Sequence, residues 1–575
     1  MLRFFQKIDI QLENTSSQKI FLFVTFSFLL FLYSPSFYGP FTLDDSHTIV
    51  NNGIIQSFDN FSSIWLSAKS YSSLPATWGY RPVNTTVNAF LWWIGDGSTL
   101  PFHLFKFLLF FSIILLLKRI WVYLYPHKIP NIVLYTCLLL FLINPVHSQV
   151  LIYVSSTSSL LCGLFVILSV WSSILYKDTG DNKYYLIAFF SIVFGLLSKE
   201  SGIVAIALIA LVELYDNKIK QDQYLNNKSL KRLLMYLVPT IIGLGLIILM
   251  YEPTTGLARG TRSGLTYFMT QWRAYLRYFA MFIYSYDLNL DNLNFGFSDS
   301  FFDWKVISSL IINIGLLLLS VVIFNKKPWF LFVLLWFYVA ISPASSIVPL
   351  GEPVNDHRAF LGYFIFGLPL FYFFDRIRRF SIELFFTVSL IFIIVYSGQT
   401  YHRAKQWSTN ESIWRDTVVK NPTSPRAINN LTVELMSQAR YQEALEVISG
   451  CAKIGATYYN CYTNMAILLA TQGRDNEAEE NFRKGIQFDK TIYKSRYFYI
   501  KFLRQRGFIG QPLALIKEAD KFTRGVNLMI RAELIDLTMV SGKTDLAKKL
   551  WSEALDNIGK HEKLLSMGER YGFNK

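Results

Sequence analysis

Long apolar stretches constrain this chain more than any other feature of its sequence. Hydrophobic residues without glycine make up 52% of the 575 residues, whereas soluble domains reach roughly 45–50% with glycine included. A helix needs about 20 apolar residues to cross a bilayer, and fewer suffice where its ends snorkel or neighbours enclose it. The sequence therefore predicts an all-α, polytopic bundle of about eleven spans. We expect these spans near residues 20–38, 101–125, 131–143, 150–175, 184–197, 201–215, 233–250, 304–323, 328–348, 359–374 and 381–398.

Every second loop between these stretches, in chain order, is basic. Because Lys and Arg accumulate on the cytoplasmic side, this pattern predicts an inner amino terminus. The first stretch lacks a small-residue cleavage site, so we expect a membrane anchor rather than a removed signal peptide. These loops hold much of the net charge of +15, and we do not expect nucleic acid to bind. Their basic residues are Lys118, Arg119 and Lys128, then Lys177 and Lys183, then the segment KIKQDQYLNNKSLKR, then Lys326 and Lys327, then RIRR.

The alternate loops, which face the outer side in this orientation, hold most of the polar motifs. These motifs are TLDDSHTIVNN, WGYRPVN, NPVHSQ, LLSKES, the 251–303 loop and EPVNDHRAF. Polar side chains near membrane spans are expensive and usually functional. An odd number of spans also places the end of the chain on the outer side. We expect a membrane domain over 1–398, a connector over 399–424 and a repeat domain over 425–575.

A 34-residue period marks the carboxyl-terminal part. The segment NNLTVELMSQARYQEALEVI aligns with TNMAILLATQGRDNEAEENF, 34 residues later. Small residues at the turn and Ala where two helices approach are typical of tetratricopeptide repeats, which stack into an α-solenoid with a concave groove. That groove could bind extended peptide, or the repeats could serve as a spacer or an oligomerisation surface. The positions that carry the period are Asn430 and Asn464, Ala439, Gly473 and Gly507, and Ala444 and Ala478, with Gly542 and Ala547 in a less regular unit and Pro512 replacing one Ala.

Four cysteines offer no metal-binding spacing. Cys137 and Cys162 lie in apolar stretches and are interpreted as buried hydrophobic residues. Cys451 and Cys461 are ten residues apart in the repeat domain, where a disulfide is an open alternative on an oxidising side of the membrane.

Two adjacent carboxylates, Asp44 and Asp45, follow the first apolar stretch. Repulsion between them could raise one pKa and make that group a general base, or cations could hold both ionised. The alternative is a solvated turn that caps the next helix.

Basic residues on the same side are candidates to hold a phosphate. Arg81 and Arg358 could clamp a phosphate through two hydrogen bonds, and Arg81 could equally snorkel. Arg273 and Arg277, four residues apart, fit one face of an interfacial helix near phosphate head groups. Lys199 and Glu200 could be an internal ion pair, and His147, His357 and Asp356 complete the candidates.

The ordered set of motifs resembles a known enzyme family. LDDSHTIVNN, YRPV, PFHLFKFLLF, NPVHSQ, SKES, YDLNLDNL, NDHRAFLGYFIFG and TYHRAKQWSTNESIWRDTVVKNPTSPRAINNL are similar, in this order, to GT-C-type glycosyltransferases that end in tetratricopeptide repeats. These are the transmembrane-and-tetratricopeptide O-mannosyltransferases and their bacterial relatives.

The resemblance implies a glycosyltransferase of class EC 2.4 that uses a polyprenyl-phosphate sugar. It places Asp44 as general base beside Asp45, and Arg358 on the leaving phosphate with His357 and Arg81. Lys199, Arg273 and Arg277 would help to bind the donor, while His147, Glu200 and Asp356 would line the donor or acceptor pocket. No cofactor is required, although a divalent cation at Asp44 and Asp45 is compatible with the motif. The chain departs from the family at Asp356, usually Glu, and at Ala359, usually Tyr.

The favoured function is protein O-glycosylation, with membrane lipid and a peptide in the repeat groove as partners. Alternatives are the same chemistry on a glycan or lipid, or a non-catalytic scaffold or transporter. A transporter would place ionisable residues near the middle of its spans, whereas these charges lie at the outer ends. We expect a bacterial inner membrane with a periplasmic site, or the reticulum membrane with a lumenal one.

Overall fold

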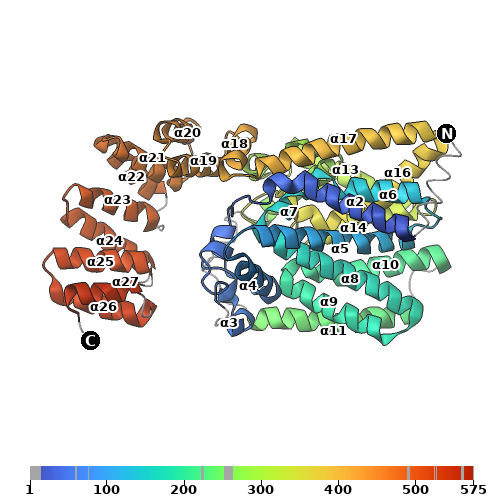
Figure 1. The fold of residues 1–575 in the computed structure, drawn as a ribbon, viewed down its shortest axis with the longest axis horizontal. Helices are drawn as coiled ribbons and strands as arrows, with labels where there is room; N and C mark the ends of the chain where they lie inside the picture. Colours follow the sequence, from blue (N-terminus) through green and yellow to red (C-terminus); the bar gives the residue numbers. More distant parts are fainter. Residues whose placement is uncertain are drawn as a thin grey trace. The chain divides into compact units, whose positions relative to one another are not determined.

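The computed structural model describes residues 15–57, 61–74, 77–221, 226–250, 263–456, 458–488, 493–523, 525, 527–558 and 562–573. These residues form helices and connecting loops, with no strand among them. The chain divides into two compact units, residues 1–413 and 414–575 (Figure 1). Residues 1–14 belong to the expected inner amino terminus, and residues 251–262 belong to the expected outer loop. Both ranges lie outside the described residues.

Six described helices of the first unit are long and apolar enough to cross a membrane, and two of them are continuous with a short 3-10 helix. Two bent pairs pass the same criterion together, which gives up to eight spans, and α9 (Asn182–Ser198) and α14 (Pro328–Ile341) are shorter apolar helices. The expected span 201–215 lies in α10 (Val204–Gln221), which meets neither criterion. All eleven expected stretches are therefore largely helical, but the structure does not confirm eleven spans. The six are α2 (Thr15–Tyr33) with η1 (Ser34–Ser36), α5 (Leu100–Leu124), η7 (Val154–Ser156) with α8 (Thr157–Thr179), α11 (Asn227–Leu249), α13 (Trp304–Val322) and α17 (Ile382–Gln406). The bent pairs are α6 (Asn131–Leu142) with η6 (Pro145–His147) and α7 (Ser148–Ile152), and η11 (Asp356–Ala359) and α15 (Phe360–Tyr363) with α16 (Gly367–Phe380).

Short elements connect the long helices of the first unit. They are η2 (Ser46–Val50), α3 (Phe61–Leu66), η4 (Ala68–Tyr71), α4 (Pro82–Gly95), η8 (Glu200–Ile203), η9 (Ser285–Asp287) and η10 (Leu293–Phe295). The amphipathic segment that was expected to lie in the membrane interface forms α12 (Gly264–Ile283), which packs against α13.

Polar residues gather at the two ends of α8. At its start, Ser155 and Ser159 contact Asp45 and Lys199. At its end, Lys177 donates hydrogen bonds to residues of α10. A helix of 23 residues is about 35 Å long at roughly 1.5 Å per residue, close to the thickness of the hydrocarbon core of a bilayer. The two polar clusters thus lie at opposite ends of a membrane-length helix, and we call the end with Asp45 the site end.

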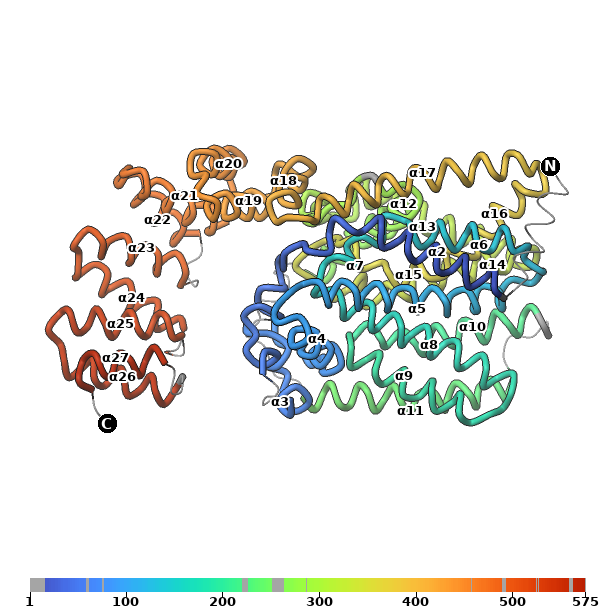
Figure 2. The backbone as a smooth tube through the Cα atoms, viewed as in Figure 1, coloured from blue at the N-terminus to red at the C-terminus, as the bar shows by residue number. Residues whose placement is uncertain are grey.

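The second unit consists of consecutive helix pairs (Figure 2). After α18 (Asn410–Lys420), which begins in the first unit, the paired helices pack against each other and against the next pair. Ala439, Gly473, Gly507 and Gly542, at the turns within the pairs, all have positive φ. This is the conformation for which a small residue is favoured, and it explains the 34-residue period. The pairs are α19 (Pro425–Ser437) with α20 (Tyr441–Lys453), α21 (Tyr459–Thr471) with α22 (Asp475–Phe488), α23 (Tyr493–Gln505) with α24 (Gly510–Thr523), and α25 (Leu528–Val540) with α26 (Thr544–Ile558), followed by α27 (Glu562–Tyr571).

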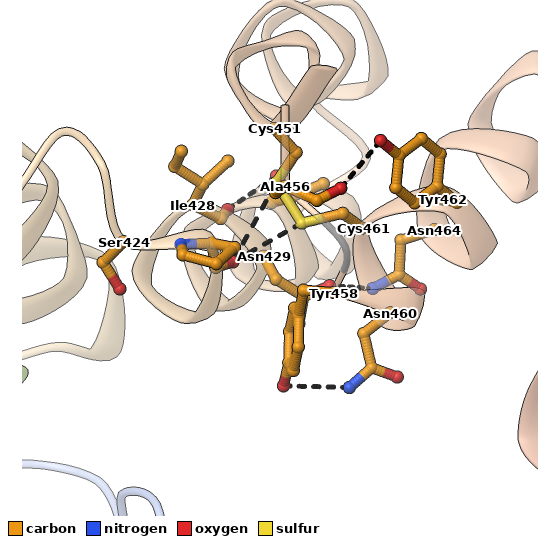
Figure 3. Close-up of a disulfide and its surroundings, with 12 residues drawn as sticks. Ser424, Ile428, Asn429, Cys451, Ala456, Tyr458, Asn460, Cys461, Tyr462 and Asn464 are labelled. Carbon is orange, nitrogen blue, oxygen red and sulfur yellow. Dashed lines mark hydrogen bonds between the residues drawn. A yellow bond between two sulfur atoms is a disulfide. The ribbon is translucent and has the colours of Figure 1, made fainter. Parts of the chain in front are cut away.

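Cys451 and Cys461 form a disulfide, which resolves the alternative that the sequence left open (Figure 3). The bond joins α20 of the first pair to α21 of the second, across a connection in which Tyr462 donates a hydrogen bond to the Ala456 carbonyl. Cys137 and Cys162 are buried and free, as expected.

Candidate active site

The two adjacent carboxylates have different environments. Asp45 is buried, and its Oδ1 accepts hydrogen bonds from the backbone N–H and the hydroxyl of Ser155, at 2.7 and 2.5 Å. Its Oδ2 accepts from the Thr42 N–H at 3.0 Å. Burial raises the pKa of Asp45, and the hydrogen bonds from Ser155 and Thr42 oppose that rise. Asp45 therefore ties its loop to the start of α8, and its side chain does not cap the following turn.

Asp44, by contrast, presents its carboxylate to solvent. The side chain is 66% exposed, and Oδ1 lies 3.4 Å from Nε2 of His47. Nδ1 of His47 lies 2.9 Å from the Ser72 hydroxyl, which orients the ring. The backbone N–H of Asp44 donates to the hydroxyl of Tyr153 at 3.1 Å. Asp44 is thus the carboxylate that a substrate can reach, and His47 was not among the predicted residues.

Tyr153 connects Asp44 with the residues of the DHR motif. Its ring centroid lies 6.4 Å from that of His357. Its carbonyl accepts a hydrogen bond from Lys106, a fully buried amine that also donates to the Ser156 hydroxyl at 3.0 Å. Tyr153 precedes the run of small hydroxyl residues at 155–159.

Arg81 is held in a two-pronged ion pair. Its Nε and one terminal nitrogen donate to the two carboxylate oxygens of Glu200, at 3.0 and 2.8 Å, and its other terminal nitrogen donates to the Tyr71 hydroxyl at 2.8 Å. Burial alone would raise the pKa of Glu200, but the Arg81 charge holds it below its usual value. Burial raises the pKa of Tyr71, where the charges of Arg81 and Asp44 act in opposite directions. The Tyr71 hydroxyl that Arg81 binds is therefore also under the electrostatic influence of Asp44.

Two cations line a small cavity at the site end. The volume is about 20 Å³, which is room for one water molecule, and the lining includes Lys199, Arg358, His357 and Ser159. Lys199 donates to the Ser159 hydroxyl at 2.9 Å. Burial and the positive charge of Arg81 lower the pKa of Lys199 to about 8. Convergence of two cations on one cavity creates a binding position for an anion.

The DHR residues are fixed by their neighbours. Arg358 donates to the Glu352 carbonyl at 2.8 Å and lies 3.8 Å from the Glu352 carboxylate. The backbone N–H of His357 donates to the Gln149 side chain at 2.9 Å, and its buried Nδ1 has no hydrogen-bond partner among the described residues. Asp356 accepts from Asn289 N–H at 2.9 Å. Asp356 thus anchors the YDLNLDNL loop.

Arg277 also binds that loop, and Arg273 binds the residues that follow it. Arg273 donates to the carbonyls of Phe295 and Gly296 and to the Ser298 hydroxyl. Arg277 donates to the Asp287 carbonyl and lies 2.9 Å from its carboxylate. The structure brings neither arginine to the cavity of Lys199 and Arg358.

His147 lies apart from these groups, in an aromatic environment. The imidazole is buried, and its ring centroid lies 4.8 to 5.8 Å from those of Phe110, Phe141 and Phe360. These contacts make it part of the packed core.

The two carboxylates are not equally accessible to a divalent cation. Both oxygens of Asp45 accept hydrogen bonds, whereas Asp44 is exposed and lies beside the mostly buried His47. Within the described residues, no group of three or more His, Cys, Asp or Glu side chains could hold a metal ion.

Three residues that the sequence reasoning missed hold predicted site residues in place, and only Ser155 comes from a distant segment. Ser155 binds Asp45, Glu352 binds Arg358, and Tyr71 binds Arg81. The only signal for them was proximity to a predicted motif, because each pairing depends on how the loops pack.

Comparison with known proteins supports the resemblance seen in the sequence. The chain is 27% identical over 208 residues to the mouse protein O-mannosyl-transferase TMTC4, over 32% of this chain and 28% of that protein. It is 21% identical over 463 residues to the Caenorhabditis elegans protein O-mannosyl-transferase F38B6.6, over 76% of this chain and 63% of that protein. The chain thus spans between about a quarter and two thirds of the lengths of these relatives, and no family model matches it.

Solved structures of repeat proteins align weakly. The tetratricopeptide protein YrrB aligns at 11% identity and a TM-score of 0.24, over 28% of this chain and 81% of that chain. Yeast Tom70 aligns at 12% identity and a TM-score of 0.25, over 77% of this chain and 92% of that chain. Together with the six membrane-length helices and the 34-residue helix pairs, the sequence comparisons show a membrane protein that is similar to the TMTC protein O-mannosyl-transferases and carries tetratricopeptide repeats.

Proposed function

We propose that the protein is a membrane glycosyltransferase that moves a sugar from a polyprenyl-phosphate donor to a Ser or Thr hydroxyl of an acceptor protein. The observation that carries this proposal is the common location of an exposed carboxylate, Asp44, and the two cations Lys199 and Arg358. Tyr153 and His357 connect them at the site end of the first unit. The names of the relatives support transfer of mannose to protein.

The proposed reaction assigns one role to each charge. Asp44 accepts the proton of the acceptor hydroxyl while that oxygen attacks the anomeric carbon. The bond from the anomeric carbon to the phosphate oxygen breaks, its electron pair stays on the phosphate, and the sugar configuration inverts. Lys199 and Arg358 stabilise the phosphate as its charge increases. His357 and Arg81 position this centre through their contacts with Gln149 and Glu200.

An apolar cavity in the same unit supports a lipid-linked donor. Its volume is about 420 Å³, and aromatic and aliphatic residues of α12, α14, α16 and α17 line it, including Phe279, Phe330 and Phe392. Phe373, in its lining, is half exposed on α16, which belongs to a bent pair that is long and apolar enough to cross a membrane. A hydrocarbon chain suits such a cavity, because apolar surface favours it over water.

The proposed location is a membrane whose outer or lumenal side is oxidising. The disulfide between Cys451 and Cys461 supports this location, because such bonds persist in the periplasm and the reticulum lumen. We favour the bacterial inner membrane, with the reticulum membrane as the alternative.

The test replaces Asp44 with Asn in cells. We expect protein-linked sugar to fall by about 10²–10⁴-fold and lipid-linked sugar to accumulate, because the general base is lost. Asp96→Asn, an exposed acid of the same unit outside the site, is the matched control at equal membrane levels. Unchanged transfer by Asp44→Asn would refute the general-base role. Loss of a glycolipid with unchanged glycoproteins would move the acceptor to the lipid or glycan class.

A further inference from the structure

His47 has a polar neighbour at each of its two ring nitrogens. Its Nδ1 lies 2.9 Å from the hydroxyl of Ser72, and its Nε2 lies 3.4 Å from Oδ1 of Asp44. The His47 side chain is 13% exposed, whereas the Asp44 side chain is 66% exposed. The imidazole thus lies between a buried hydroxyl and the carboxylate that a substrate can reach.

The segment that carries Ser72 is fixed to the turn that carries His47. The backbone N–H and the hydroxyl of Ser73 both donate to the His47 carbonyl, at 3.0 and 3.2 Å. Within the turn, the backbone N–H of His47 donates to the Asp44 carbonyl at 3.1 Å. These bonds fix the backbone on both sides of the ring, so the imidazole has a defined orientation relative to Asp44.

These neighbours assign a tautomer to the neutral ring. An ionised carboxylate only accepts hydrogen bonds, so the ring proton faces Asp44 at Nε2. Nδ1 then accepts a hydrogen bond from the Ser72 hydroxyl. The oxygen of Ser72 in turn accepts from the Leu74 N–H at 3.0 Å and lies 2.7 Å from the Thr77 hydroxyl. His47 is therefore a hydrogen-bond donor directed at the Asp44 carboxylate.

We propose that His47 is a positioning residue that holds the Asp44 carboxylate toward the acceptor hydroxyl. An exposed carboxylate can rotate about its Cβ–Cγ bond, and a donor at a fixed place restricts that rotation. The contact of 3.4 Å is longer than an ordinary hydrogen bond, and such contacts at a catalytic group often shorten when the substrate binds. The proton of the acceptor passes to Asp44, and His47 keeps its own proton throughout. This role rests on the proposed function, because it requires Asp44 to be the general base.

Two substitutions of similar shape separate the two ring nitrogens. In His47→Asn the amide can reach Ser72 as Nδ1 does, whereas in His47→Gln it can reach Asp44 as Nε2 does. We expect His47→Asn to lower kcat about 10–100-fold through misalignment of the base, with KM for the donor changed less than about twofold. His47→Gln should restore kcat to within about fivefold of the unaltered protein. The assay is transfer of mannose from a polyprenyl-phosphate donor to a peptide rich in Ser and Thr, by the purified full-length protein in detergent.

A double variant shows whether His47 acts through Asp44. In the Asp44→Asn background, His47→Asn should lower the residual rate less than about twofold, because the group that it positions is absent. His127→Asn, which changes an exposed histidine beyond the other end of α5, is the matched control and should retain the unaltered rate. Thermal unfolding of the His47 variants should match that of the unaltered protein, and a shared decrease would leave His47 with a structural role only.

The outcomes distinguish this role from the proposed function. Equal rates for His47→Asn and His47→Gln, or an undiminished further loss in the Asp44→Asn background, would overturn the positioning role and leave Asp44 as the base. Unchanged transfer by Asp44→Asn, or no transfer by the unaltered protein, would overturn the proposed function and this role with it.

Discussion

The two units of the molecule differ in how their ion pairs relate to the sequence. In the repeat unit, some ion pairs are local and recur with the sequence: Arg440 binds Glu443, and 34 residues later Arg474 binds Glu477. Other pairs join neighbouring helix pairs, such as Arg506 with Asp475. In the membrane unit, Arg81 binds Glu200 across 119 positions of the chain. Local pairs follow from helical spacing, whereas distant pairs require the whole bundle.

This difference indicates in which unit a substitution should have a large effect. An exposed pair three residues apart contributes little to stability, and the first two repeats each have their own copy. At the site end of the membrane unit, buried polar groups such as Asp45 have partners from one specific distant segment, and removal of one partner leaves the other unsatisfied. We therefore expect large effects at the site end and small ones in the repeats.

The largest effect is expected from Arg358→Ala. Loss of the cation that faces the developing phosphate charge should lower transfer by about 10²–10³-fold, or roughly 3–4 kcal/mol. The measurement is the turnover of a polyprenyl-phosphate sugar by purified protein. Arg378→Ala, which removes a pair with Asp375 at the opposite end of the same bent helix pair, serves as the control. Equal losses in the two variants would remove Arg358 from the site.

Lys199 should make donor binding depend on pH. Its pKa is lowered to about 8, so the amine is charged below that pH and loses its charge as pH rises through it. Loss of a charge-assisted contact should weaken the donor by about 1.5–3 kcal/mol between roughly pH 7 and pH 10. Lys199→Arg keeps the charge and should flatten the profile. An identical fall in the arginine variant would show that another group titrates.

Asp45→Asn should lower stability by about 1–3 kcal/mol, because the new amide would face the Thr42 N–H, a donor. Asp44→Asn should leave thermal unfolding unchanged, since that carboxylate is exposed. Unfolding in detergent, followed by circular dichroism, separates the two. If both variants melted alike, the structural role of Asp45 would be wrong.

The smallest effect should appear at the turns of the repeats. Ala439→Gly should stabilise the repeat unit by about 0.5–1 kcal/mol, because its φ of 58° is unfavourable for Ala. Gly473→Ala should destabilise it by about 1–2 kcal/mol, since an added Cβ meets no atom within 4 Å and only the backbone is strained. Hydrogen exchange of the neighbouring helices measures both. Destabilisation by Ala439→Gly, or stabilisation by Gly473→Ala, would contradict the equivalence of the turns.

Much of the fold was predictable because its signals are local. The apolar stretches became helices, and the period of 34 became helix pairs with turns at Ala439 and Gly473. The number of spans was not predictable in the same way. Bent pairs and short apolar helices such as α9 and α14 are recognised only when neighbouring helices enclose them.

The sequence by itself determined the helical architecture, the order of the motifs and the repeat period, because these depend on residues close together in the chain. Only the tertiary structure decided that Asp45 is buried against Ser155 while Asp44 faces solvent, and that Lys199 and Arg358 share a cavity. Adjacent residues of the same type are chemically alike in a sequence. They differ when packing removes water from one carboxylate and supplies its hydrogen bonds from a distant segment.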